Sequence, residues 1–239
     1  MCQSSLGNGK EGNTTKMNVL DLFSGLEGWS KPFKDRGHET ITVDINPKFN
    51  PTICKDIFDL NEDDLPAFWQ PDIILASPPC NCFSIASVYR HWDKNTKRPK
   101  DNATKYAIDL VAYTINFILT QYPRWWILEN PRGMLRHVLG KPQVTTYFAS
   151  WQSWEEINES HRAFHDVRKP CFKPTDLWGI LPNVKWDEPM EWAKAPRGAK
   201  EGIQGIKDRD IRAKIPYGLA LAICLACEKE LESQTKLLK

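Results

Sequence analysis

Two short stretches of this chain carry side chains that could do covalent chemistry. The first reads ILASPPCNCFS over residues 74–84, an apolar run that ends in two prolines and Cys80. Because proline has no backbone N–H, Pro78 and Pro79 end a strand without wasting a ladder donor and fix the direction in which Cys80 leaves it. A thiolate can add to an electron-poor carbon, and basic neighbours lower the pKa of a thiol. The polar, constrained surroundings favour this nucleophile over the alternative, a small buried thiol.

The second stretch, WILENP over residues 126–131, places Glu129 and Asn130 at the end of another apolar run. A thiol that attacks the sixth carbon of a pyrimidine needs a partner that stabilises charge at the third ring nitrogen and contacts the exocyclic amine. Burial near Trp125 and Trp126 would keep the Glu129 carboxyl protonated or sharing a proton, as this role requires. The addition makes the fifth carbon nucleophilic toward a methyl sulfonium, and proton loss at that carbon then releases the thiol.

A third stretch, DLFSGLEGW over residues 21–29, suits a ligand that approaches the backbone. Gly25 and Gly28 follow a predicted strand and open a predicted helix, whose N-terminus favours such an approach. The spacing lacks the G-x-G-x-x-G pattern of a dinucleotide site, which favours an adenosine-type ligand without a pyrophosphate. Asp44 follows about 20 residues later, where a carboxylate typically binds ribose hydroxyls, and Asp56 could accept from an adenine amino group. The alternative is that each aspartate only caps its own turn.

The segments that must position these residues alternate between strand and helix patterns. We predict strands, all apolar or β-branched, at residues 17–25, 38–47, 52–60, 71–79, 124–131, 141–150 and 172–180. Helices are predicted at 26–37 and 103–123, a helical turn at 63–70 and a last helix from Pro216. This alternation predicts an α/β fold with a doubly wound, mostly parallel sheet that is covered on both faces.

In such a sheet the ligand binds at the carboxyl ends of the strands. That edge, called the rim below, would then carry Asp21, Phe23, Asp44, Asp56, Cys80, Glu129 and Asn130. Successive strands that all finish on polar or reactive residues are more informative than any single motif.

Composition narrows the setting and the partners. The chain of 239 residues is 41% hydrophobic and 26% charged, and it has no apolar run near the ~20 residues that span a bilayer. Its start has no secretory apolar region, and its seven cysteines indicate reduced thiols, so we expect a cytoplasmic protein without a membrane partner. Neither Cys80 with Cys82 nor Cys224 with Cys227 has the partners of a zinc site, so no metal is expected.

The net charge is only +2, so a nucleic-acid partner must be recognised through a local patch. Residues 90–105 hold six basic residues against two acidic ones and directly follow the cysteine motif. An idle surface loop is the alternative for this stretch, but its position favours a loop that closes on a nucleic acid.

The motifs DLFSGLEGWS, VDINP, KDI, SPPCNCFS and ENP, in this order, resemble the DNA cytosine-5 methyltransferase family, in particular its small phage-type members. The resemblance covers roughly residues 18–132 and IPYGLALAI near the end. It implies a Rossmann-like methyltransferase fold, S-adenosylmethionine as cofactor, and a covalent bond from Cys80 to a cytosine flipped out of double-stranded DNA. It also implies cofactor contacts from Phe23, Ser24, Gly25, Leu26, Asp44, Ile45, Asp56, Ile57 and Pro78.

Glu129 and Asn130 would complete the catalytic group, but three family features depart from the pattern. Glu-Asn-Val is Glu-Asn-Pro here, and Gly218, Leu219 and Ala220 replace a Gly-Asn-Ser. The Gln-x-Arg-x-Arg segment, whose arginine helps bind the base, has no clean match. Its nearest candidates are Lys169, Lys173 and Arg168, of which Arg168 is included among the predicted catalytic residues.

The resemblance also suggests a domain plan: a disordered tail at 1–16, a catalytic domain at 17–179, a small target-recognition lobe at 180–212 and a C-terminal helix at 213–239 that completes the catalytic domain. With so small a lobe, we expect a monomer with weak sequence specificity that acts in DNA methylation of the restriction-modification or phage kind. Three alternatives remain: methylation of RNA, such as tRNA, at cytosine carbon 5, methylation of an exocyclic amine, and a nucleic-acid-binding module with a decayed active site.

Overall fold

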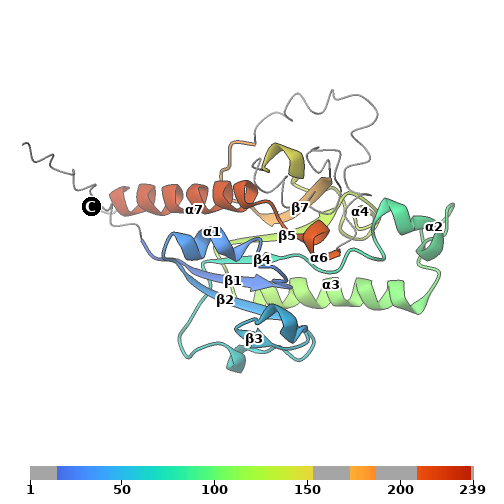
Figure 1. Cartoon of the computed structure of the whole chain (residues 1–239), viewed down its shortest axis with the longest axis horizontal. Helices are drawn as coiled ribbons and strands as arrows, with labels where there is room; N and C mark the ends of the chain where they lie inside the picture. The colour runs from blue at the N-terminus through green and yellow to red at the C-terminus, as the bar shows by residue number, and fades with distance from the viewer. Residues whose placement is uncertain (1–14, 153–172, 187–208, 238–239) are drawn as a thin grey trace, which may run out of the picture.

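The computed structural model describes residues 15–152, 173–186 and 209–237, and a sheet forms its centre (Figure 1). Within these residues the sheet has seven strands in the order β3-β2-β1-β4-β5-β7-β6. The strands are β1 Asn18–Leu22, β2 Glu39–Asp44, β3 Ile53–Cys54, β4 Ile73–Ala76, β5 Trp125–Pro131, β6 Val144–Tyr147 and β7 Pro174–Ile180. The first five are parallel, whereas β7 runs antiparallel between β5 and β6. The predicted doubly wound, mostly parallel α/β fold is confirmed.

The strands are apolar on both sides because helices cover both faces of the sheet. Along β1, Val19 belongs to a core beneath α1 (Ser30–Asp35) and α7 (Tyr217–Leu237), which lie together on one side of the sheet in Figure 1. Leu20 points the other way, into a core that includes Phe117 and Ile118 of α3 (Asn102–Thr120). Side chains that alternate along a strand thus fill two cores at once, which fixes the register of the sheet.

Helix α3 forms where its sequence combines an N-cap with a buried stripe. The side chain of Asp101 accepts from the backbone N–H of Thr104. This hydrogen bond, together with those from the Thr104 hydroxyl and from His91, lowers the pKa of Asp101 to about 2. Val111, Thr114 and Ile118 are buried at the spacing of one helix face. The shorter helices are α2 Val88–His91, α4 Arg136–Leu139 and α6 Arg209–Ala213, with 3₁₀ turns at Pro47–Phe49, Glu62–Asp64, Ile85–Ser87 and Phe148–Ser150.

The helical turn predicted at 63–70 is wrong in its position. A 3₁₀ turn occupies Glu62–Asp64 instead, and it starts at Asn61, whose side chain forms a capping box with Asp64. The next residue, Leu65, has an extended backbone, as expected for a residue that precedes a proline. The 3₁₀ turn therefore ends before the proline, and a separate turn follows, in which Trp69 N donates to the Pro66 carbonyl oxygen at 2.9 Å.

The first residues of the predicted recognition lobe pack with the catalytic core. Leu181, Val184 and Trp186 contact the core beneath α7, and the backbone N–H of Asn183 donates to Glu230 of that helix. Lobe residues 187–208 lie outside the described residues, as do 1–14 of the predicted tail, and the last lobe residues, 209–212, belong to the short helix α6. The lobe therefore stays a prediction, with its described start at 181–186 attached to the core.

Candidate active site

Cys80 and Glu129 leave neighbouring strands at the same edge of the sheet. Strands β4 and β5 are parallel, and Ala76, the last residue of β4, pairs with Leu128. Cys80 therefore follows β4 by four residues, and Glu129 follows the paired position directly. The side-chain amide of Asn130 donates to the carbonyl oxygen of Pro78 at 3.0 Å and holds the Pro-Pro-Cys segment against β5. Cys80 and Glu129 thus both lie at the carboxyl ends of neighbouring strands, while their catalytic roles stay predictions.

The turn that carries Cys80 is fixed by backbone contacts. The N–H groups of Phe83 and Ser84 both donate to the carbonyl oxygen of Cys80 at 3.0 Å, while Phe83 is fully buried. Phe83 in turn accepts from Met134 N at 2.7 Å, and a side chain at Gly133 would come within 2.1 Å of the Phe83 carbonyl oxygen. Only glycine permits this close approach, which anchors the turn while its half-buried cysteine stays at the rim.

Strand β7 supplies the polar neighbours of Glu129, which is itself only 3% exposed. The Thr175 hydroxyl donates to Glu129 Oε1, and the Lys173 ammonium lies 3.8 Å from the same oxygen. Lys173 is also buried and places its ammonium 4.2 Å from the centre of the Phe148 ring. Within the described part of the chain, the lysine Nζ makes an ion pair and a cation–π contact but no hydrogen bond.

This arrangement bears on which basic residue could bind the base. Arg168, the residue predicted from sequence, lies outside the described residues, so its role stays a prediction. Lys173, one of the other candidates, is the cation placed beside Glu129. Lys173 reaches Glu129 because it directly precedes β7, which pairs antiparallel with β5, and no local sequence pattern gives this pairing.

The glycine turn after β1 is tied to the end of β2 by Asp44. Its Oδ2 accepts from Gly25 N at 2.9 Å, and its Oδ1 accepts from Asn46 N at 2.8 Å. Asp44 therefore caps its own turn, but a carboxylate has further lone pairs and can still accept from a ligand hydroxyl. Phe23 adopts a left-handed backbone with φ 59°, a strained state for a bulky residue that is often found at ligand sites.

Asp21 and Ser24 are buried beneath this turn with unused hydrogen-bonding capacity. Asp21 is fully buried, and its Oδ2 accepts from Ser30 N at 3.2 Å. Its Oδ1 and the Ser24 hydroxyl have no hydrogen-bond partner among the described residues. Burial raises the pKa of Asp21 to about 7 from its usual 3.8. The sequence placed Asp21 on the rim but gave no sign that its Oδ1 would lack a hydrogen-bond partner among the described residues.

The other predicted cofactor residues fall into two groups. Leu26 and Ile45 are 43% and 62% exposed, so apolar side chains face solvent next to Asp44. By contrast, Ile57 packs its side chain into the core beneath α3, and Pro78 is buried. Asp56 accepts from Phe58 N at 3.1 Å, which is the turn-capping alternative considered for it.

A model of C-5 cytosine-specific DNA methylases matches residues 17–150, more than half of the chain and the part that holds Cys80, Glu129 and the glycine turn. The chain belongs to the C-5 cytosine-specific DNA methylase family.

The individual methyltransferases that the chain resembles share low sequence identity with it. The chain is 30% identical over 128 residues to the type II methyltransferase M.AplI of Arthrospira platensis, covering 49% of this chain and 32% of that one. It shares 25% identity over 174 residues with a probable DNA (cytosine-5)-methyltransferase of Frog virus 3, covering 70% and 74% of the two chains. Among solved structures, the S. pombe Dnmt2 methyltransferase aligns with a TM-score of 0.37 and 17% identity, over 75% of this chain and 53% of that one. The matched part is thus about a third of the M.AplI chain.

Beyond the cysteine turn, the chain carries a basic hairpin at 91–100. The indole N–H of Trp92 donates to the Cys82 carbonyl oxygen at 2.6 Å, and Trp92 bridges to Pro99 across the hairpin. Asp93 closes the tip by accepting from Asn95 and Thr96. The exposed basic residues of the hairpin are Lys94, Lys97, Arg98 and Lys100. A cationic surface is therefore attached to the segment that bears Cys80.

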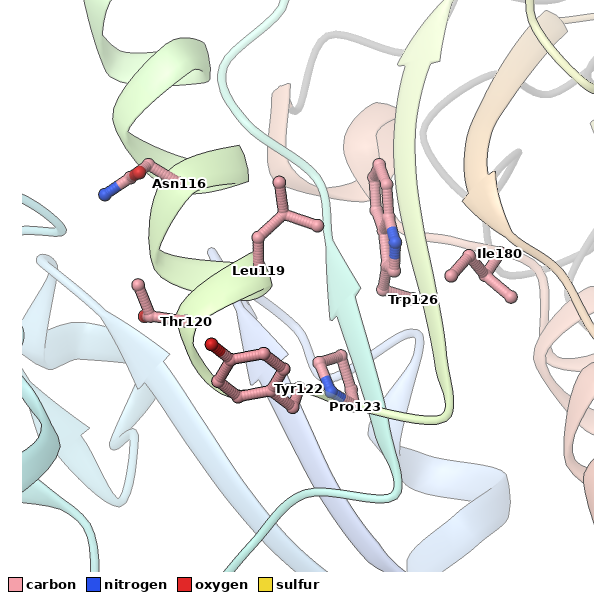
Figure 2. A pocket seen from close by; sticks show the side chains of 7 residues that line it. All are labelled: Asn116, Leu119, Thr120, Tyr122, Pro123, Trp126 and Ile180. Atoms are coloured by element: carbon pink, nitrogen blue, oxygen red, sulfur yellow. The ribbon is translucent and has the colours of Figure 1, made fainter.

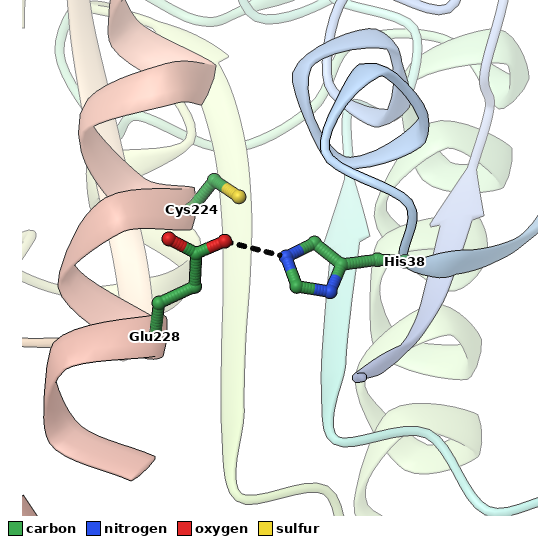
Figure 3. A group of neighbouring side chains, drawn as sticks. All are labelled: His38, Cys224 and Glu228. Carbon is green, nitrogen blue, oxygen red and sulfur yellow. Dashed lines mark hydrogen bonds and ion pairs between the residues drawn. The ribbon is translucent and has the colours of Figure 1, made fainter. Parts of the chain in front are cut away.

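His38, Cys224 and Glu228 form a buried group (Figure 3), with metal-ligand atoms within 4.8 Å of one another. However, the Arg36 guanidinium donates to both oxygens of Glu228, at 2.8 and 2.7 Å. His38 Nδ1 accepts from Met17 N, so its Nε2 carries the proton that it donates to Glu228 at 3.0 Å. Burial raises the pKa of Cys224 to about 12. The group fastens α7 to the α1–β2 connection and needs no metal ion.

A surface hollow lies at the opposite edge of the sheet from the rim. In Figure 2, Leu119, Tyr122 and Pro123 at the end of α3 face Trp126 and Ile180. Trp126 stands near the start of β5 and Ile180 ends the antiparallel β7, so both mark the amino end of β5. The hollow is therefore separate from the candidate active site. No helix among the described residues is long and apolar enough to cross a membrane.

Proposed function

We propose that this protein transfers a methyl group from S-adenosylmethionine to carbon 5 of cytosine in DNA, with Cys80 as the nucleophile. The observation that carries the proposal is the position of Cys80 and Glu129 at the carboxyl ends of the neighbouring parallel strands β4 and β5. Cys80 lies four residues after β4, Glu129 lies near the end of β5, and the Asn130–Pro78 hydrogen bond joins the two segments. A thiol and a carboxyl group so placed can contact two parts of one pyrimidine ring. Membership of the methylase family supports this reading.

The residues of the glycine turn fit S-adenosylmethionine. The unpartnered Oδ1 of Asp21 and the Ser24 hydroxyl suit a ligand that brings an ammonium group, and Asp44 can accept from ribose hydroxyls. The exposed side chains of Leu26 and Ile45 offer apolar contact to a purine ring. When bound, the cofactor supplies an electrophilic methyl group on a sulfonium.

The chain's own residues perform the steps on the base. The Cys80 thiolate forms a bond to carbon 6 of cytosine, while Glu129 gives its proton to the third ring nitrogen and the electron pair of the 5,6 double bond becomes available at carbon 5. After carbon 5 has taken the methyl group, its proton passes to solvent, and the electron pair restores the double bond and expels the thiolate. The proton on the ring nitrogen returns to Glu129, so both side chains end as they began.

We propose that Lys173 stabilises this addition from the side of β7. Its buried ammonium makes no hydrogen bond within the described residues and can donate one to a ligand, and the carbonyl oxygen at carbon 2 of the ring lies next to the nitrogen that Glu129 contacts. Charge that develops on this oxygen during thiolate addition would be stabilised by the fixed cation. Thr175 keeps Glu129 in position through its hydroxyl.

Duplex DNA must release the target cytosine before a group at the rim can reach it. The basic hairpin 91–100 supports this step, because its lysines and Arg98 are exposed and suited to phosphate oxygens. Trp92 joins the hairpin to the backbone two residues beyond Cys80, so phosphate contacts would hold the thiol near the flipped base.

A DNA duplex containing 5-fluorocytosine tests the proposal. Fluorine replaces the hydrogen at carbon 5 that must be lost as a proton before the thiolate is expelled, so the thiol stays attached to the base. With S-adenosylmethionine present, the full chain should form an adduct that survives denaturing electrophoresis. Cys80→Ser should abolish the adduct, whereas Cys54→Ser, which removes an exposed thiol at the end of β3, should not. An adduct in the Cys80→Ser variant would overturn the nucleophile assignment. Adducts with RNA alone would redirect the activity to RNA, and no adduct with either would favour a binding module.

A further inference from the structure

One hydrogen bond joins the glycine turn to the segment that carries the thiol. The indole N–H of Trp29 donates to the hydroxyl oxygen of Ser77 at 2.9 Å. Trp29 directly follows the turn and is only 2% exposed, while Ser77 directly precedes Pro78. The proposed cofactor turn and the proposed nucleophile therefore meet through two side chains to which the sequence pattern gave no role.

On the thiol side, Ser77 has little freedom to move. Its backbone N–H donates to the Leu22 carbonyl oxygen at 3.3 Å, and Asn130 holds the next residue, Pro78, through its carbonyl oxygen. Two successive prolines restrict the backbone between Ser77 and Cys80. A displacement of the Ser77 backbone would therefore also displace Cys80, because only the two restricted prolines separate the two residues.

On the cofactor side, Trp29 is fixed by its neighbours in the chain. A Cβ at Gly28 would lie 2.6 Å from the backbone nitrogen of Ile215, so the turn is pressed against the segment before α7. The N–H of Ser30 donates to Asp21, whose other carboxyl oxygen has no hydrogen-bond partner within the part of the chain that the structure describes. A ligand that contacts the turn or Asp21 would therefore act directly on the segment that holds the indole.

We infer that the Trp29–Ser77 hydrogen bond couples occupancy of the glycine turn to placement of the Cys80 thiol. The inference rests on the proposed function and makes Trp29 and Ser77 positioning residues that do not contact the base. Coupling between two sites is reciprocal, so a base engaged by the thiol must also tighten cofactor binding by the same factor.

The coupling factor compares two dissociation constants for S-adenosylhomocysteine, both measured by calorimetry. It is the constant for the free protein divided by the constant for the protein bound to a mixed-sequence duplex containing 5-fluorocytosine. It should exceed 1 in the wild type. Ser77→Ala and Trp29→Phe should each lower the factor by about three- to tenfold, as expected for one hydrogen bond, with little change in affinity for the free protein. The double variant should lower it no further than either single change.

Two further variants separate positioning from general loosening. Ser77→Thr keeps the hydroxyl and should retain the coupling. Trp178→Phe removes another buried indole donor, which binds the Gly140 carbonyl oxygen at 3.1 Å, and should leave the factor unchanged. A wild-type factor of 1, equal factors in the wild type and Ser77→Ala, or an equal loss in Trp178→Phe would overturn the inference. Each result can occur while the covalent adduct still forms, whereas a missing adduct is the failure of the proposed function.

Discussion

The buried carboxyl group of Asp21 makes folding stability depend on pH in a way that one isosteric substitution should remove. In the folded protein its pKa is raised to about 7, chiefly by burial, against an ordinary value of 3.8. Between these two values the folded state keeps a proton that the unfolded chain has lost. Stability therefore falls as the pH rises through this window, by about 1.4 kcal/mol per pH unit, and levels off above about pH 7.

Asp21→Asn keeps the shape and the oxygen that accepts from Ser30 N, but it cannot ionise. The free energy of unfolding of the variant, relative to that of the wild type, should therefore increase with pH. Two pH units correspond to about 2 to 3 kcal/mol in the free energy of unfolding. Subtracting the wild type at each pH removes the contribution of the other titrating groups, which the two proteins share.

The assay is urea unfolding of both proteins, followed by tryptophan fluorescence at pH 5, 6, 7 and 8. The difference in unfolding free energy should rise by about 2 to 3 kcal/mol from pH 5 to 7 and change little from 7 to 8. A difference that stays constant, or that falls with pH, would refute the reasoning that Asp21 is buried as a protonated acid.

Substitutions at three further residues test other parts of the site and the fold. Asp44→Ala should weaken S-adenosylhomocysteine binding by about tenfold or more in calorimetry, and an unchanged affinity would remove Asp44 from the cofactor site. Lys173→Met should slow adduct formation on 5-fluorocytosine DNA by about 100-fold in single-turnover experiments, with partial recovery in Lys173→Arg; equal rates would exclude a role for the cation. Glu228→Gln should lower the free energy of unfolding in urea by about 2 to 3 kcal/mol, since Arg36 loses its buried partner, and an unchanged midpoint would contradict that account.

The sequence predicted the parallel half of the fold because its strands are short apolar runs with polar ends. Asp44 and Glu129 close such runs, so their shared edge follows from the parallel alternation alone. The alternation also predicted the long helix before β5, where a capped start coincides with a periodic buried face.

The cation beside Glu129 could not be ranked from the sequence. Lys173 reaches Glu129 only because β7 pairs antiparallel with β5, in a register where Thr175 lies opposite Pro131. A register between strands more than forty residues apart depends on tertiary packing, which local patterns do not encode. Arg168 was an equally basic choice five residues earlier in the chain.

Unsatisfied polar groups are hidden from sequence reasoning for the same reason. The missing partner of Asp21 Oδ1 depends on how the glycine turn folds over it, and the Trp29–Ser77 contact joins residues 48 positions apart. The difference at 63–70 has a local cause instead, since the capping box at Asn61 starts a 3₁₀ turn that ends before Pro66.

The most direct test of the central claim is a crystal structure of the protein trapped on 5-fluorocytosine DNA with its methyl donor. The account predicts continuous density between Cys80 Sγ and carbon 6 of an extruded base, with Glu129 within hydrogen-bonding distance of the third ring nitrogen or the exocyclic amine. A base bonded to another cysteine, or a Glu129 side chain turned away from the ring, would contradict it.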